Sequence, residues 1–321
     1  MEDKEELCFP QLSNLSCRKP SSSSSEMMTV RVVMSSIALL TVALNLLVII
    51  AISHFRQLHT PTNILLLSLA VSDFLVGIFI MPNEILRKSS CWFFGEYVCL
   101  MCYYLTFTIT SASIGDMVLI SVDRYVAICD PLRYSSRITE RRVKVCVCLC
   151  WLCSVLYTGI YLKNNFSHLG TYNSCYGKCV IKLNFIQGTV DLVVTFIAPI
   201  TAIVFLYTQV FAVAVIQARA MRSKVTAGVT AKKSELKAAT TLGVLVVVFL
   251  LCFCPFYGLL LSGKGLLRTP FLSFVIFLLY FNSCLNPLIY TLFYPWFRKA
   301  LRLIVTLQIL KPGSCNAKIL R

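Results

Sequence analysis

The sequence predicts an all-α membrane protein, a bundle of seven transmembrane helices followed by a short amphipathic C-terminal helix. Two observations carry this prediction. Hydrophobic residues make up 57% of the 321-residue chain and charged residues only 14%, against roughly 25% charged residues in ordinary soluble domains. The apolar residues also gather in long blocks, and a block of about 18 or more residues with few charges is typical of a membrane-spanning helix.

Seven apolar blocks set the order of the predicted helices. They cover residues 30–53, 63–83, 98–122, 144–163, 185–210, 238–262 and 270–293. We therefore predict an extracellular N-terminal segment over residues 1–29, the bundle over 30–293, and a cytoplasmic amphipathic helix with its tail over 294–321. Seven spans leave no room for a second globular domain. The basic stretch 295–308 predicts a helix lying on the inner leaflet, with Cys315 beyond it as a candidate palmitoylation site.

The distribution of basic residues predicts the topology. The loops at 54–62, 123–144 and 211–237 and the tail after residue 293 hold 19 of the 30 Lys and Arg residues, and the opposite side holds 11. Cationic loops remain cytoplasmic, so we expect an extracellular N-terminus. The net charge of +16 then reflects membrane topology and contact with lipids, and no nucleic-acid partner is expected.

Modifications are expected on the extracellular side. Asn14 and Asn165 each begin an Asn-x-Ser pattern typical of glycosylation acceptors. Cysteines in an oxidising compartment should pair. Those on this side include Cys8, Cys17, Cys99, Cys175 and Cys179. Cys99 begins the third span and should pair with one cysteine of the loop before the fifth span, while an N-terminal cysteine takes the other; spacing alone does not fix the connectivity.

Charged residues at the cytoplasmic end predict a breakable latch. Asp123 and Arg124 are adjacent at the inner end of the third span. Glu235 begins the sixth span on the same side and could pair with Arg124 across the bundle. The alternative is an interfacial cluster of charges that snorkel to the membrane surface.

Asp73 lies near the middle of the second span, where an ionisable group is costly and indicates function. Oxygen-bearing side chains of the third and seventh spans lie at comparable depth, namely Ser113, Asn282, Ser283 and Asn286. Such a set can hold sodium, although a water-filled polar network is the alternative. Asp116, deeper in the third span, is expected to form a structural hydrogen bond with a neighbouring helix.

Asp191 differs from the other acids of the spans because it lies in the outer third of the bundle, roughly 10 Å below the surface. Gln187, Asp191 and Thr195 recur every four residues and should share one face. Other residues expected around the same cavity are Tyr103, Thr106, Phe107, Thr110, Phe253, Phe256, Tyr257 and Tyr280. A cavity with one buried negative charge and a lining of aromatic side chains predicts a cationic ligand with an apolar body.

Two features leave alternatives open around this cavity. Asp191 could pair with Lys178 or Lys182 near the same helix top, which would make it structural. Glu84, at the outer end of the second span, is a candidate second anion and would suit a diamine. It could instead pair with Arg87 or Lys88.

Several motifs resemble those of the rhodopsin-like G-protein-coupled receptors over essentially the whole chain. Asp123-Arg124-Tyr125 is similar to their DRY motif, and Asn286-Pro287-Leu-Ile-Tyr290 to their NPxxY motif. The other span signatures are Asn45, the stretch 69–73, Trp151, Pro199 with Tyr207, and Pro255. The resemblance implies that Arg124 contacts a heterotrimeric G protein once the sixth helix swings outward, with Tyr207 and Tyr290 supporting the active state.

A narrower resemblance concerns the stretches 282–297 and 126–134, which are similar to fingerprints of the trace amine-associated receptors. It implies an olfactory receptor for amines in the plasma membrane that raises cAMP through a stimulatory G protein. It also implies two disulfides, Cys17–Cys175 and Cys99–Cys179.

Two departures from that pattern shape the expected site. Thr106 stands where most amine receptors carry an Asp on the third helix. Some members use a fifth-helix Asp instead, which here is Asp191, so the ligand amine should point toward the fifth helix. Phe253 replaces the usual Trp before the sixth-helix proline and is expected to act as a packing toggle.

Other function classes fit the sequence less well. A transporter would show inverted repeats and paired broken helices, and seven spans without an internal repeat do not divide into two halves. Within receptors, the alternative is a peptide or lipid ligand with Asp191 structural. No nucleophile–base arrangement, phosphate loop or metal cluster indicates an enzyme, and no cofactor is expected beyond a sodium ion.

Overall fold

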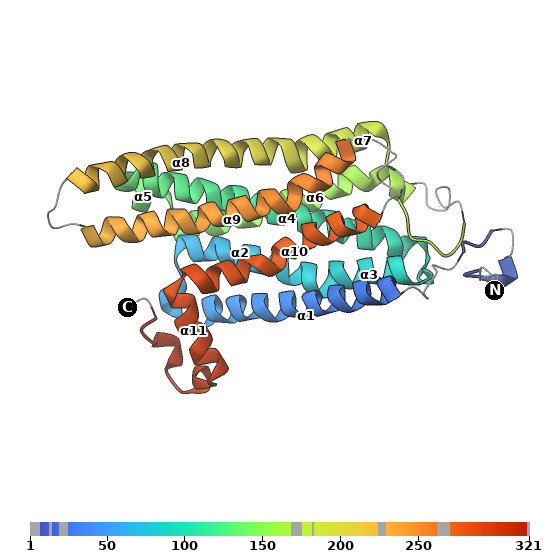
Figure 1. The fold of residues 1–321 in the computed structure, drawn as a ribbon, viewed down its shortest axis with the longest axis horizontal. Coiled ribbons are helices and arrows are strands. Elements are labelled where there is room, and N and C mark those ends of the chain that lie inside the picture. The colour runs from blue at the N-terminus through green and yellow to red at the C-terminus, as the bar shows by residue number, and fades with distance from the viewer. Residues whose placement is uncertain are drawn as a thin grey trace.

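The computed structural model describes residues 7–12, 15–18, 25–167, 175–181, 183–223, 229–261 and 270–319. Its long helices run alongside one another in an elongated bundle (Figure 1). They are α1 (Ser25–His54); α2 (Pro61–Leu75), continued by the π-turn η3 (Val76–Ile80) and α3 (Met81–Ser89); α4 (Gly95–Cys129); α6 (Glu140–Ser167); α7 (Phe185–Asp191), continued by the π-turn η4 (Leu192–Ile197) and α8 (Ala198–Ser223); α9 (Val229–Leu261); and α10 (Pro270–Phe293). The short elements are η1 (Pro10–Leu12), η2 (Arg56–Leu58), α5 (Pro131–Arg137), α11 (Pro295–Val305), η6 (Gln308–Leu310) and η7 (Ser314–Asn316).

The helices have the length and the apolar surface that a membrane requires. Six described stretches qualify, namely Arg31–His54, Pro61–Ser89, Gly95–Cys129, Glu140–Ser167, Phe185–Val213 and Phe274–Phe293, and α9 adds the shorter apolar stretch Gly243–Leu259. Many apolar side chains point away from the bundle; Leu39 and Ile160 expose 72% and 76% of their surface. Such surface suits lipid and not water. The chain is therefore an all-α, multi-pass membrane protein, as the composition predicts.

Several helices extend beyond the apolar blocks that predict them. α1 begins at Ser25, α6 at Glu140 and α9 at Val229, each ahead of its predicted span. The backbone hydrogen bonds of a helix do not require an apolar side chain, so a helix can continue past the hydrocarbon core into water. Hydropathy locates the membrane-embedded part of each helix and not the ends of the helix.

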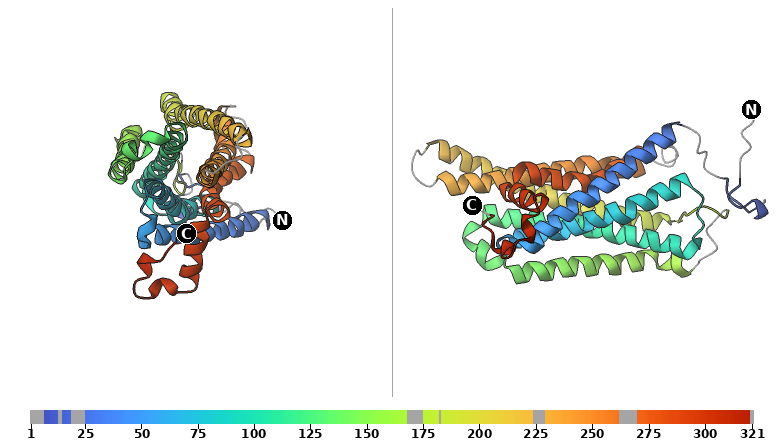
Figure 2. Two further views of the ribbon diagram at one scale, coloured as in Figure 1. Left: turned by 90° about the vertical axis from the view of Figure 1, so that its left-hand side faces the viewer. Right: turned by 90° about the horizontal axis from the view of Figure 1, so that it is seen from below.

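α4 occupies the centre of the bundle. It packs against α2, α6, α8 and α9, while α10 packs against α9 and α1. Viewed along the bundle, α4 lies between α6 on one side and α9 and α10 on the other (Figure 2). Asn45 joins α1 to α10, because its Nδ2 donates to the Ser283 carbonyl at 2.9 Å. The central position of α4 brings both of its ends into the polar sites described below.

Two π-turns interrupt the second and fifth spans, each just before a proline. η3 ends two residues before Pro82, and η4 ends two residues before Pro199. Proline lacks an N–H group and its ring crowds the carbonyl four residues earlier, so the preceding turn relaxes to wider hydrogen bonds. In the fifth span this wide turn begins directly after Asp191.

Three disulfides gather at one end of the bundle, which we call the disulfide end. They are Cys8–Cys91, Cys17–Cys175 and Cys99–Cys179. The second and third are the pairs that the family resemblance implies; the first was not predicted and engages the loop between α3 and α4. Backbone bonds reinforce this end: Cys17 N donates to the Tyr176 carbonyl at 2.8 Å and Trp92 N to the Gly177 carbonyl at 3.0 Å. The described N-terminal residues are therefore fixed to both loops.

α11 turns away from the bundle near the opposite end and projects from its side (Figure 1). Trp296 and Phe297 are buried, and Arg298 Nη1 donates to the Thr291 and Leu292 carbonyls at 3.0 and 2.8 Å, near the end of α10. This arrangement satisfies carbonyls that a helix end leaves without partners. The short amphipathic helix is thus present where the sequence predicts it.

Candidate ligand site and signalling motifs

Asp191 faces the bundle interior near the disulfide end. It is half-buried at the end of α7, and its Oδ1 accepts a hydrogen bond from the Tyr157 hydroxyl of α6 at 3.2 Å. Thr195 lies beside it and shares a 3.0 Å hydrogen bond with the Tyr257 hydroxyl of α9. Among the described residues Asp191 has no ion-pair partner; Lys178 is exposed, and Lys182 lies outside the described residues. The carboxylate therefore retains capacity for a cation.

Aromatic rings surround this carboxylate. Tyr157 stacks on Tyr161 at 5.8 Å between ring centroids, and Tyr161 meets Phe107 edge-on at 5.2 Å. Phe196 stacks on Tyr257 at 4.1 Å on the side of α9. The Tyr161 hydroxyl is buried and has no hydrogen-bond partner within the described part of the chain. The site thus offers a carboxylate, ring faces and an unsatisfied hydroxyl.

Sequence reasoning missed three of these rings, those of Tyr157, Tyr161 and Phe196. In the fourth span, Tyr157 and Tyr161 are four residues apart and therefore lie on one helical face. That spacing on a span otherwise rich in Val, Leu and Cys was the available signal. Phe196 carried no comparable signal, because its direction depends on the π-turn η4.

Gln187, an expected ligand contact, forms hydrogen bonds within the protein. Its Oε1 accepts from the Asn184 backbone N–H at 3.0 Å, and its Nε2 donates to the Tyr161 carbonyl at 2.8 Å. Gln187 therefore caps the first turn of α7 and joins it to α6. Its polar groups are occupied, which disfavours a direct contact with ligand.

The remaining predicted residues divide between two regions. Phe256 meets Tyr257 edge-on at 5.1 Å, and Phe253 packs against Phe249 at 4.2 Å, so both belong to the α9 wall. The Thr106 hydroxyl donates to the Cys102 carbonyl of its own helix at 2.8 Å, and Thr110 is half-buried on the same helix. Tyr103 and Tyr280 lie near the charged residues at the end of α3.

Glu84 and Arg87 form an ion pair at the disulfide end of α3. Glu84 is buried, and the Arg87 guanidinium lies over the Tyr103 ring with its Cζ 4.4 Å from the centroid. The Tyr103 hydroxyl donates to the Cys179 carbonyl at 3.4 Å. Of the alternatives for Glu84, the structure therefore favours its neutralisation by Arg87.

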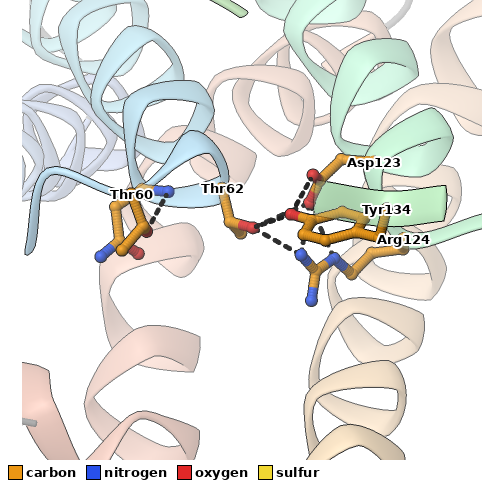
Figure 3. Close-up of polar contacts among 6 residues, drawn as sticks. Thr60, Thr62, Asp123, Arg124 and Tyr134 are labelled. Carbon is orange, nitrogen blue, oxygen red and sulfur yellow. Dashed lines mark hydrogen bonds and ion pairs between the residues drawn. The ribbon is translucent and has the colours of Figure 1, made fainter. Parts of the chain in front are cut away.

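The opposite end of the bundle holds a polar cluster around Asp123 (Figure 3). Arg124 forms an ion pair with Asp123, Thr62 donates to Asp123 Oδ2 at 2.9 Å, and Tyr134 donates to Asp123 Oδ1 at 2.9 Å. Burial and the Asp123 carboxylate raise the pKa of the Tyr134 phenol, so it stays protonated as a donor. Thr60 caps the start of α2, next to Thr62. We call Thr62, Asp123, Arg124 and Tyr134 the arginine clasp.

The predicted latch joins Arg124 to Glu235 of the sixth span. The clasp instead joins Asp123 and Arg124 to Thr62 of α2 and Tyr134 of α5. The side chain of Glu235 lies outside the described side chains, so its pairing with Arg124 stays a prediction. Tyr207 and Tyr290 are at least half-buried, and the hydroxyl of each lacks a hydrogen-bond partner within the described residues. Tyr125 packs beside Ile128 next to the clasp.

Asp73 and its neighbours form a second buried polar group midway along the bundle. Asn286 Nδ2 donates to Asp73 Oδ2 at 2.7 Å. Three buried oxygens have no hydrogen-bond partner among the described atoms: Asp73 Oδ1, Asn282 Oδ1 and Asn286 Oδ1. Ser113 and Ser283 are also buried. Unsatisfied carboxylate and amide oxygens suit a hard cation, so this set fits sodium.

Asp116 has the structural hydrogen bond expected of it. The Ser68 hydroxyl of α2 lies 2.9 and 2.8 Å from its two carboxylate oxygens, and Trp151 Nε1 of α6 donates to the Ser68 oxygen at 3.0 Å. This relay joins three helices. A side chain at Gly115 would come within 2.3 Å of Cys150 Sγ, so glycine permits the close approach of α4 and α6.

The structure describes one of the two expected glycosylation sites, Asn165. Asn165 lies within α6 and exposes only 5% of its surface. A glycan requires an accessible acceptor, so this burial disfavours Asn165 as an attachment point. Asn14 lies outside the described residues and stays a prediction.

Comparison with known proteins identifies the class. The chain matches the family described as 7 transmembrane receptor (rhodopsin family) over residues 44–290. It is 38% identical over 331 residues to trace amine-associated receptor 13c of Danio rerio, covering 99% of this chain and 97% of that receptor. It is 38% identical over 302 residues to trace amine-associated receptor 1 of Mus musculus, covering 89% and 91%. Identity to trace amine-associated receptor 4 of Mus musculus is 35% over 334 residues, covering 98% and 95%.

The chain belongs to the rhodopsin family of seven-transmembrane receptors, as its motifs and its bundle indicate. It is thus a receptor and not an enzyme or a transporter. Within that class, it is a member of the trace amine-associated receptor family, given these identities over nearly its whole length.

Proposed function

We propose that this chain is a plasma-membrane receptor for an amine and that the ligand's ammonium binds Asp191. The observation that carries the proposal is a half-buried carboxylate that faces aromatic rings and has no cationic partner among the described residues. At 4 Å and an effective dielectric constant of about 20, an ammonium–carboxylate pair gains roughly 4 kcal/mol before desolvation. An aromatic face adds roughly 0.5–2 kcal/mol. The names of the relatives support an amine as the ligand class.

The disulfide end faces the exterior in this proposal. Disulfides form in oxidising compartments, and the opposite end carries the larger share of Lys and Arg, which favours the cytoplasm. The ligand site then opens to the exterior, and the arginine clasp lies on the side of the G protein.

Signalling proceeds as a two-state switch in this proposal. The inactive state keeps Arg124 in the clasp, and activation moves α9 outward from the kink at Pro255, so that Arg124 is released for a G protein. A shift of the two-state population from 1:99 to 99:1 requires about 5.5 kcal/mol of differential affinity, which exceeds the roughly 4 kcal/mol that the ion pair at Asp191 supplies before desolvation. The aromatic wall and the G protein therefore contribute. By family resemblance, the partner is a stimulatory G protein that raises cAMP, and the setting is olfaction.

We propose that a sodium ion binds the inactive state of the receptor. Asp73, Ser113, Asn282, Ser283 and Asn286 would hold it, and its positive charge would offset the buried carboxylate. The unsatisfied oxygens at this site support the proposal.

The amine anchor is tested by Asp191→Asn, which keeps the shape and removes the charge. We expect loss of the response to an amine panel, measured as cAMP in transfected cells, while surface labelling stays at the level of the unsubstituted receptor. Thr189→Ala is the matched control, because Thr189 is exposed on the same helix. An undiminished amine response in Asp191→Asn would refute the anchor, and amine binding without cAMP would refute only the choice of G protein.

A further inference from the structure

A second charged group lies at the disulfide end, on α3 and apart from Asp191. It consists of Glu84, Arg87 and the next residue, Lys88. Glu84 exposes 5% of its surface and is engaged by Arg87, whose side chain is 17% exposed. Lys88 lies within electrostatic range of both. We call these three residues the α3 charge group.

The sign of this group decides what it can bind. It contains one carboxylate and two cations, so its net charge is positive. The carboxylate is already paired, while a guanidinium has five N–H donors in a fork that matches a second carboxylate. A ligand ammonium would meet repulsion here, and a ligand anion would meet attraction.

Aromatic rings connect the α3 charge group to Asp191. Arg87 lies over Tyr103, and Tyr103 is 6.5 Å from Phe107 between ring centroids. Phe107 is 5.2 Å from Tyr161, which stacks on Tyr157, the hydrogen-bond donor to Asp191. These ring contacts run from Arg87 to Asp191, so an apolar ligand body that packs along them would have a cation partner at one end and an anion partner at the other.

We propose that this receptor prefers a zwitterionic ligand, with its ammonium at Asp191 and a carboxylate or comparable anion at Arg87, over a diamine. The proposal deepens the amine function and rests on it. The buried Tyr161 hydroxyl, which has no partner among the described residues, lies along the same path and can donate to a polar group of the ligand.

The test compares three compounds of equal chain length: a linear monoamine, the α,ω-diamine and the ω-amino acid, over a short series of lengths. Competition binding to the full-length receptor in membranes is the readout, because it does not depend on a particular G protein. In the unsubstituted receptor, the amino acid should bind at least about tenfold more tightly than the diamine at the best length.

Arg87→Gln should reverse this preference. It removes the anion partner and leaves Glu84 with Lys88 alone, so that the net charge of the group falls from +1 to zero. Amino-acid affinity should therefore fall at least about tenfold while diamine affinity rises. Glu84→Gln/Arg87→Gln/Lys88→Gln, which leaves no charge in the group, should bind amino acid and diamine about equally and keep the monoamine affinity. Lys163→Gln is the matched control, because it removes an exposed cation at the disulfide end of α6.

The outcomes separate the two proposals. If none of the compounds binds, or if Asp191→Asn leaves binding unchanged, the amine site itself is refuted. If the monoamine binds through Asp191 but the diamine equals or exceeds the amino acid, or if Arg87→Gln leaves the preference unchanged, only the zwitterion proposal is overturned.

Discussion

Ser68→Ala is the sharpest test of the interior packing, because Ser68 is the centre of a relay between three helices. Its hydroxyl lies 2.9 and 2.8 Å from the two oxygens of Asp116, and it accepts from Trp151 Nε1 at 3.0 Å. Ser68 exposes 6% of its surface and Asp116 none. Alanine would leave a buried carboxylate without its described donor and an indole N–H without its acceptor.

The expected decrease in the free energy of unfolding follows from the loss of these two hydrogen bonds. A hydrogen bond between membrane helices contributes about 0.6 kcal/mol on average and up to about 1.7 kcal/mol. A buried donor or acceptor left without a partner costs about 1–3 kcal/mol. Ser68→Ala should therefore destabilise the receptor by about 2–4 kcal/mol.

Thermal stability of the detergent-solubilised receptor, followed by size-exclusion chromatography after heating, measures this effect without relying on tryptophan fluorescence. Ser36→Ala is the control, since Ser36 is exposed and its hydroxyl donates only to the Val32 carbonyl of its own helix at 2.8 Å. Asp116→Asn should reduce the cost of Ser68→Ala, because residues in one network are not additive. A melting temperature for Ser68→Ala equal to that of Ser36→Ala would refute the relay.

Three further predictions address the other sites. Tyr134→Phe removes one hydrogen bond from Asp123, of about 1 kcal/mol, and should raise basal signalling about fivefold; unchanged or lower basal cAMP would contradict the clasp as an inactive-state lock. Gly177→Ala should sharply lower the folded receptor at the cell surface, because Gly177 has a φ of +106° and its Cβ would lie 2.6 Å from Cys8 Cβ, whereas Gly188→Ala, with open space around it, should express normally; equal surface labelling would be the contrary result. Asp73→Asn should abolish any stabilisation of the inactive state by sodium over potassium, measured by antagonist binding in the two salts, and a persistent sodium effect would place the ion elsewhere.

The agreement between sequence and structure is best where one physical constraint acts on a single segment. Hydrocarbon thickness requires each span to be long and apolar, so the spans and the amphipathic α11 are visible in the sequence. An acid inside a span is costly wherever the helix lies, so Asp73, Asp116 and Asp191 stand out without coordinates. The family motifs, including the residues of the clasp on α4, are equally local.

Sequence and structure disagree about a residue's contacts where those contacts depend on how its helix is rotated about its own axis relative to the neighbouring helices. A membrane helix is apolar on its lipid face and largely apolar on its packed face, so hydropathy does not fix that rotation. Gln187 fits the polar stripe in the sequence, yet the structure uses it to cap α7 and join it to α6. Tyr157 is not among the residues that the sequence predicts around the cavity, yet its hydroxyl donates the hydrogen bond to Asp191.

The sequence by itself determined the class of this protein, its membrane spans, its acidic interior residues and its family. Each of these depends on composition or on a short motif within one segment. Only the tertiary structure decided the partners: Tyr157 for Asp191, Ser68 for Asp116 and Cys91 for Cys8. Partners are set by contacts between segments far apart in the chain, and those contacts depend on helix rotation, π-turns and loop paths that no single segment encodes.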